Sequence, residues 1–393
     1  MNSLTQKATL AASPLLVLFA FALPLSTSAA SILAILLLLV WLLSGNIKEK
    51  FSEILHNPVT IAVLLYIILH IIGLLWSEDL AWGLKILKKQ WKLLLFPVFL
   101  TLVNRKHTKY YMAAFVAAIF LKACKAYLVW LGFISLPIGS VFTTVGTSHV
   151  IYNPMLALAC YIILQNLLFK KNTRIVQWSQ MFLFLFLSCN MFITVGRTGQ
   201  AVFFILLAVA LSQYFYSRSK KLLLAGLVLL PLLLPATYQI SSTFKERVDT
   251  AVTELKNFSS GEITSMGCRV WYCKNTLVLV QNNWITGTGT GDFPAEYAKI
   301  NKIYSPAMPY TDNPHNQYLL TLSQFGVIGL ISLAAIFLSQ LILAFKEKDN
   351  LSPLRQAFPI FFLVIMLGES YLQVYGTGFL FSLFSAFLYK DCT

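Results

Sequence analysis

The apolar positions of this chain form long runs that alternate with short polar segments. Most runs hold about 17 to 25 residues, enough for an α-helix to cross the ~30 Å hydrocarbon core of a membrane. The pattern predicts an all-α, polytopic membrane helical bundle with about twelve transmembrane helices. We expect them at residues 8–23, 28–44, 58–76, 93–104, 111–134, 150–169, 178–196, 200–217, 222–239, 315–344, 352–368 and 371–389.

One long polar stretch interrupts this pattern. From Gln239 to Pro314 the chain is polar for about 75 residues, and hydrophobicity resumes after His315 and Asn316. We therefore expect three regions: residues 1–239 with the first nine helices, residues 240–314 as a large, partly helical extramembrane loop, and residues 315–393 with the last three helices.

Basic residues predict the orientation of the bundle. Five alternate short loops are rich in Lys and Arg, whereas the connections near 24–27, 135–149 and 368–371 contain neither. By the positive-inside rule the basic loops are cytoplasmic, both termini lie inside, and the large loop faces outward. The basic loop residues are Lys48, Lys50, Arg105, Lys106, Lys109, Lys170, Lys171, Arg174, Arg218, Lys220, Lys221, Lys346, Lys348 and Arg355.

Composition agrees with a membrane protein. Hydrophobic residues make up 58% of the chain and charged residues 11%, against about 25% charged residues in an average soluble domain. A net charge of +15 is compatible with nucleic acid, but the membrane topology already accounts for the cytoplasmic basic residues, so we expect no nucleic-acid partner. The outward-facing basic residues need another explanation.

Four outward lysines are spaced at i, i+3, i+4 and i+7, a pattern that places their ammonium groups on one face of a helix. Trp82, Leu84, Leu87 and Trp91 lie between them, which predicts an amphipathic helix in the membrane interface. Attraction to anionic lipid headgroups and a dedicated phosphate-binding role explain the pattern equally well. The lysines are Lys85, Lys88, Lys89 and Lys92.

Arg197 is the only charged residue in a tight outer turn, Gly196-Arg197-Thr198-Gly199. A guanidinium binds phosphate with two parallel hydrogen bonds, and flanking glycines let a ligand approach the backbone. The alternative is an arginine that extends from a membrane helix to the interface. In the large loop, Arg247 is a candidate substrate-binding residue or a solvated charge on a helix.

A glycine run follows in the same loop, with Gly287, Gly289 and Gly291. It lacks a preceding hydrophobic strand and does not match the dinucleotide or P-loop patterns. We interpret it as a flexible turn that lines a cleft.

The order of these motifs resembles the O-antigen ligase and polymerase superfamily. The matching pieces are Arg197 at an outer turn, Arg269 with Trp271 in the large loop, the glycine turn, and His315-Asn316 with Gly326 and Gly329 entering a helix. Gln324 departs from the family, where an acidic residue often precedes the Phe-Gly pair.

The resemblance implies a GT-C-like glycosyltransferase of the bacterial inner membrane with a periplasmic active site. Its donor would be a glycan on undecaprenyl pyrophosphate. In the ligase branch the acceptor is a sugar hydroxyl of the lipid A core, and in the polymerase branch it is another carrier-linked repeat unit. The resemblance also implies roles for Arg269, Trp271 and Asn316 in the site.

Residue chemistry suggests how such a transfer works. Transfer needs a base for the acceptor hydroxyl and positive charge on the departing diphosphate. His315, the only histidine in or beside the large loop, is the candidate base, and its alternative is a histidine that caps the helix or forms hydrogen bonds at its start. Arg197 and Arg269 are the candidate clamp. His149 is a candidate for the acceptor path.

We expect no metal and no cofactor, because the chain has no Asp-x-Asp pair and its outer acidic residues lack divalent-ligand spacing.

Two other classes of membrane protein remain open. A transporter of lipid-linked sugars would use Lys122, Lys125 and Glu369 along a polar path, although the sequence shows no internal repeat. A structural membrane partner would not require arginines and a histidine on one face.

Overall fold

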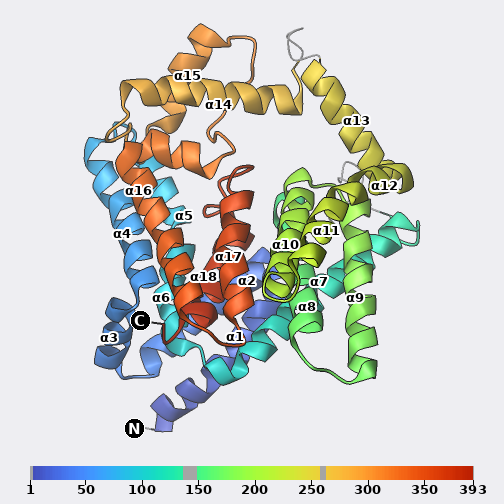
Figure 1. The fold of residues 1–393 in the computed structure, drawn as a ribbon. Helices are drawn as coiled ribbons and strands as arrows, with labels where there is room; N and C mark the ends of the chain where they lie inside the picture. The colour runs from blue at the N-terminus through green and yellow to red at the C-terminus, as the bar shows by residue number, and fades with distance from the viewer. Residues whose placement is uncertain (1–2, 136–147, 257–262, 393) are drawn as a thin grey trace.

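The fold was obtained as a computed structural model, which describes residues 3–135, 148–256 and 263–392 (Figure 1). These residues form α-helices and three short 3₁₀ turns, with no β-strand among them. The predicted all-α membrane class is confirmed. By length and composition, eight of the described helices are able to cross a membrane, or nine if the bent pair at residues 27–56 counts as one span.

The helices of the first half, up to the first undescribed gap, are α1 (Ser3–Leu25), α2 (Thr27–Leu43), α3 (Ile47–His56), α4 (Pro58–Ile72), α5 (Leu80–Lys89), α6 (Trp91–Leu102) and α7 (Thr108–Trp130). Those between the gaps are α8 (His149–Phe169), α9 (Arg174–Ile193), α10 (Arg197–Phe215), α11 (Lys220–Leu229), α12 (Leu233–Ile240) and α13 (Ser242–Lys256). The last are α14 (Ser265–Asn282), α15 (Phe293–Tyr304), α16 (Gln317–Lys346), α17 (Ser352–Ile365) and α18 (Tyr375–Tyr389). The 3₁₀ turns are Gly73–Trp76, Arg105–His107 and Leu230–Leu232.

Each expected apolar run falls on a helix, but α2, α6, α17 and α18 are too short to span alone. By length and composition, eight or nine candidate spans therefore stand among the described residues, against the about twelve predicted. Burial gives the reason for α6 and α18, which pack along each other inside the bundle with nearly every residue buried. Apolar runs of this length are typical of core helices, so their hydrophobicity reflects protein neighbours as well as lipid.

The predicted cytoplasmic loops share one end of the bundle. There Asp349 pairs with Arg105 and, at 2.8 Å, with the fully buried Arg355, while Lys390 pairs with Glu53 at 2.9 Å. Both chain ends are drawn at this end in Figure 1. As the charge pattern predicts, these ion pairs bring together residues 48–56, 105–109, 346–355 and 390.

The large polar loop lies at the other end of the bundle, away from the predicted cytoplasmic loops. Figure 1 shows α14 lying across the ends of the spanning helices, with α15 above it and α13 running from α12 toward the end of α14. Thr264 caps α14 by accepting a hydrogen bond from Gly267 N, and Asn316 caps α16 by accepting from Tyr318 N and Leu319 N.

The glycine run is a packed connection, and the prediction of a flexible, cleft-lining turn is wrong. Residues 287–292 are buried against the turn after α4 and the start of α16. A Cβ on Gly291 would lie 2.0 Å from the Asp79 carbonyl oxygen, and one on Gly287 would lie 2.3 Å from the Gln324 backbone. The glycines are present because two backbones meet there. Gln324 stabilises the run by donating to Thr290 O at 2.8 Å.

The lysine-rich segment is broken at Gln90, so the prediction of one continuous helical face is wrong. Lys85 and Lys88 are exposed on α5 and Lys89 is half-buried. Lys92 lies in the first turn of α6 and is fully buried, where its Nζ donates to Gln373 O at 2.6 Å and lies 4.4 Å from the Tyr375 ring centre. Lys92 therefore anchors the 370–375 turn and is not part of an interfacial face.

Candidate active site

A cavity of about 270 Å³ lies at the end of the bundle that carries the large polar loop. It is formed by the first turns of three helices, by the C-terminal part of α13 and by the turn between α17 and α18. Its lining residues are His149, Val150, Val195, Gly196, Arg197, Thr198, Gly199, Glu254, Ser265, Arg269, Gly368 and Tyr371. Three predicted site residues from distant parts of the chain, His149, Arg197 and Arg269, therefore share one cavity.

The backbone of this cavity favours an anion. His149, Arg197 and Ser265 are the first residues of α8, α10 and α14, so three helix N-termini converge on it. Each N-terminus carries a partial positive charge and backbone N–H groups without an intrahelical partner. The N-terminus of α10 has no side-chain cap, because its N-cap residue is Gly196. Together with two guanidinium groups, this arrangement fits phosphate groups.

The glycines beside Arg197 have a structural reason that differs from the predicted one. A Cβ on Gly199 would lie 2.3 Å from Asn153 Cβ, and one on Gly196 would lie 2.6 Å from Asn153 Nδ2. The two glycines allow α10 to pack closely against α8. Both also line the cavity, so close helix packing brings the backbone and Arg197 to it.

A carboxylate that we did not predict occupies part of the cavity. Glu254 Oε2 lies 3.5 Å from Arg197 Nη2 and accepts a hydrogen bond from Met266 N at 3.3 Å. The Glu254 side chain is 14% exposed and the Arg197 side chain 38%. Sequence spacing gave no signal for this pair, because 57 positions separate two residues that meet only in the fold.

His315 lies beside the cavity in an unusual backbone conformation. Its φ of 52° is in the left-handed region, which is uncommon outside glycine, and its N–H donates to Asn313 Oδ1 at 3.0 Å. Its imidazole stacks on the Tyr272 ring, with ring centres 5.8 Å apart. Asn316 caps α16, so a capping role for His315 is wrong, while its hydrogen bonds fit the other alternative, a hydrogen-bonding histidine at the start of the helix.

Glu369 is the partner of His315. The distance from His315 Nδ1 to Glu369 Oε2 is 2.6 Å, and the carboxylate also accepts from Asn313 Nδ2 at 2.6 Å and Ser370 N at 2.9 Å. Burial alone would raise the pKa of Glu369, but the hydrogen bond and charge of His315 and the other donors bring it below its usual value. When the imidazole is neutral, the ionised Glu369 favours the tautomer with the proton on Nδ1, in which Nε2 is the acceptor.

Two tyrosines connect the His315–Glu369 pair to the cavity. Tyr272 lies on α14 three residues after Arg269, on the same helical face, and stacks on His315. Tyr371 lines the cavity two residues after Glu369. Its side chain forms a hydrogen bond with that of Thr198, the residue after Arg197. Burial and the nearby Glu369 charge raise the pKa of Tyr371, which keeps the phenol protonated. The candidate base and the candidate clamp are thus neighbours in the structure.

One lysine of α5 also reaches this site. Lys89 is half-buried and interacts electrostatically with Asp312 and Glu369. Burial, with a contribution from Lys85, lowers its pKa below the usual lysine value, and the two acids oppose that shift. Lys85 lies 3.8 Å from the Trp82 ring centre and is exposed, as an interfacial cation would be.

Other predicted site residues lie differently. The Asn316 side chain is taken up by the helix cap and by a hydrogen bond to Leu367 O at 3.2 Å, so its structural role is explained without substrate. Trp271 is half-buried, with Lys274 Nζ 5.1 Å from its ring centre, while its neighbour Tyr272 is the aromatic that meets His315. Arg247 belongs to α13, and its side chain lies outside the described residues.

Within the described ranges, no group of three or more His, Cys, Asp and Glu side chains has the arrangement of a metal site. Glu369, which the transporter alternative placed on a polar path, pairs with His315 instead.

Comparison with known families gives an independent result. Residues 181–334 match the family model described as O-antigen ligase. This segment is therefore similar to the O-antigen ligase superfamily. It runs from α9 into α16 and includes Arg197, Arg269 and His315 of the ligase domain, whereas Glu369 lies beyond its end. A search of curated proteins found no match. The match supports glycosyl transfer of the O-antigen ligase or polymerase type by a multi-pass membrane protein acting on lipid-linked glycans.

Proposed function

We propose that this protein is an O-antigen ligase that moves a glycan from undecaprenyl pyrophosphate to a sugar hydroxyl of the lipid A core, at the periplasmic face of the bacterial inner membrane. The observation that carries the proposal is the cavity where three helix N-termini, Arg197 and Arg269 meet beside His315 and Glu369. It combines an anion site with a base that is oriented by a carboxylate.

In this proposal the donor diphosphate occupies the cavity. Arg197 and Arg269 bind its oxygens, and the N-termini of α8, α10 and α14 add their N–H groups and partial charge. Charge on the diphosphate grows as the bond from the anomeric carbon to the phosphate oxygen breaks. The clamp therefore stabilises the transition state more than the bound donor, which is the condition for faster chemistry.

His315 activates the acceptor in the same step. The acceptor oxygen attacks the anomeric carbon, its proton moves to His315 Nε2, and the electron pair of the broken bond leaves on the diphosphate. Glu369 fixes the tautomer and stabilises the imidazolium that forms, as the carboxylate does in other His–carboxylate pairs. We assign His149, on the cavity wall, to the acceptor side, and Lys85, Lys88 and Lys89 to guiding the donor from the membrane surface. This scheme needs no metal.

Reconstitution tests the proposal. Purified protein in vesicles is mixed with an undecaprenyl-diphosphate-linked glycan and lipid A core, and products are separated by mass. A glycan joined to the lipid A core supports the ligase. A longer carrier-linked glycan would instead identify a polymerase, and movement of the donor across the bilayer with no new covalent bond would identify a transporter.

A further inference from the structure

The Glu254 carboxylate uses the partners that a phosphate oxygen would use. Its Oε2 contacts the Arg197 guanidinium at 3.5 Å and a backbone N–H in the first turn of α14, that of Met266, at 3.3 Å. A guanidinium and a helix N-terminus are the two groups that bind phosphate most readily in proteins. Glu254 itself lines the cavity.

From these contacts we propose that Glu254 is a placeholder anion: its carboxylate fills part of the diphosphate subsite while the site is unloaded, and the donor diphosphate displaces it. The inference rests on the proposed function, because it assumes that the cavity takes a diphosphate. It adds a built-in competitor to that site. In the unloaded protein the carboxylate neutralises Arg197. It also accepts a hydrogen bond from Met266 N, which would otherwise be without that acceptor.

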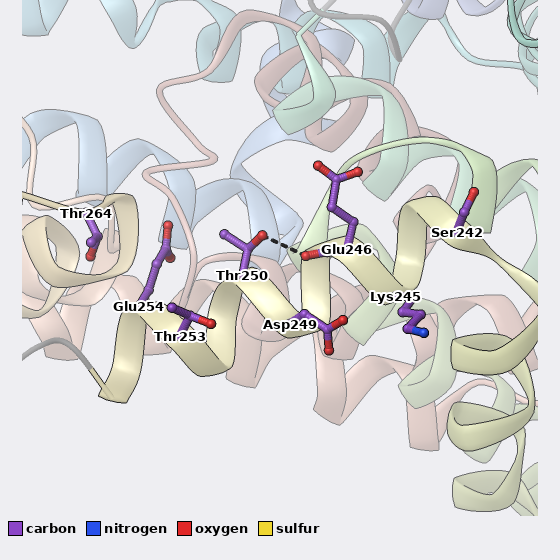
Figure 2. Close-up of a pocket in the computed structure, with 8 residues that line it drawn as sticks. All are labelled: Ser242, Lys245, Glu246, Asp249, Thr250, Thr253, Glu254 and Thr264. Carbon is purple, nitrogen blue, oxygen red and sulfur yellow. Dashed lines mark hydrogen bonds between the residues drawn. The ribbon is translucent and has the colours of Figure 1, made fainter.

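A neighbouring cavity gives the displaced carboxylate a place to go. Glu254 also lines a cavity of about 660 Å³ along the polar face of α13. Figure 2 shows Glu254 at the end of this face nearest Thr264, with Thr250 and Glu246 farther along the helix. Because Glu254 borders both cavities, rotation of its side chain moves the carboxylate from one to the other without a shift of the α13 backbone.

The chain offers a matched control for this competition. Glu246 lies on the same helix and lines only the α13 cavity, so Glu246→Gln changes the net charge as Glu254→Gln does without touching the anion cavity. Glu254→Gln keeps the size of the side chain and an oxygen that accepts from Met266 N, so it removes the charge alone.

The test is calorimetric titration of the purified, detergent-solubilised protein with inorganic pyrophosphate. Glu254→Gln should lower the Kd about fivefold, the factor that corresponds to the ~1 kcal/mol of a partly exposed ion pair, and Glu246→Gln should leave it within about twofold of wild type. Glu254→Ala should also bind more tightly than wild type, which covers the case in which the amide variant folds poorly.

Unchanged or weaker binding in both Glu254 variants would overturn the placeholder role, since the carboxylate would then assist the anion or be indifferent to it. Failure of the two proposals is distinguishable. If wild type binds pyrophosphate and Arg197→Ala abolishes that binding, the anion site stands whatever Glu254 does. If wild type and the Glu254 variants are folded and none binds pyrophosphate, the proposed function fails and the placeholder fails with it.

Discussion

At the scale of single residues, the proposal requires Arg197 and Arg269, which both line the cavity, to make forked contacts with phosphate oxygens. Lysine keeps the charge but is a point donor on a flexible stem, so it does not reproduce that contact. We predict that Arg197→Lys and Arg269→Lys each lower kcat/KM of glycan transfer by about 10²-fold. Arg218→Lys, after the other end of α10, is the control and should retain normal rates. Near-normal transfer by Arg197→Lys would identify an arginine that only extends to the membrane interface.

A second residue-scale prediction concerns the orienting carboxylate. Glu369→Gln removes the charge that stabilises the His315 imidazolium and does not alter the cavity lining, so kcat should fall about 10²- to 10⁴-fold with little change in donor KM. Initial rates at varied donor concentration measure this. Because the two residues act as a unit, a variant that combines Glu369→Gln with His315→Ala should be no slower than His315→Ala alone. Additive losses would show that Glu369 acts elsewhere.

Some site residues were predictable from the sequence and others were not, depending on whether a local sequence pattern marked them. Arg197, Arg269 and His149 were predicted from sidedness and motif order, and the structure brings them to one cavity. Glu369 and Glu254 could not be paired in advance, since each meets a partner more than 50 positions away. Single-sequence patterns report periodicity and local motifs, whereas such contacts arise from the packing of distant helices.

At the scale of elements, the glycine run joins the outer loop to α4 and α16 by close backbone packing. A Cβ at Gly291 would lie 2.0 Å from the Asp79 carbonyl oxygen, which cannot move as a side-chain end can. We predict that Gly291→Ala lowers the free energy of unfolding by ~3 kcal/mol. Thermal unfolding in detergent measures the loss. Gly226→Ala, in the interior of α11 with its nearest contact at 3.3 Å, is the control and should stay close to wild type. Equal midpoints for the two variants would contradict the packing role.

The elements themselves were largely predictable, because long apolar runs have few alternatives to a helix. Two kinds of feature were not. The break at Gln90 interrupts a run of good helical spacing, and it arises from tertiary contacts: Gln90 bonds to His70 and Lys92 to Gln373. The glycine run resembled a flexible turn because its composition is that of a turn, and only the partner backbones show why glycine is needed.

At the scale of the whole molecule, the charged clusters at the two ends of the bundle belong to different tasks. Asp349, Arg355 and Lys390 tie together the end that the positive-inside rule assigns to the cytoplasm. The opposite end brings together the arginine-lined cavity and the His315–Glu369 pair, which we propose bind the diphosphate and activate the acceptor. If arginines and helix N-termini supply all the positive charge that the leaving group needs, chelators should leave the transfer rate unchanged. Loss of activity in EDTA that Mg²⁺ or Mn²⁺ restores would contradict this.

The most direct test of the central claim is the transfer reaction itself, run with wild type, Arg269→Lys and Glu369→Gln in the same vesicles. The claim is that one outer-face site joins a diphosphate clamp to a His–carboxylate base. Wild type should release undecaprenyl diphosphate in step with the formation of glycan-bearing lipid A core, and both variants should lose the two products together. Transfer by the two variants at wild-type rates would contradict the claim, because neither the clamp nor the base would then be needed for the chemistry.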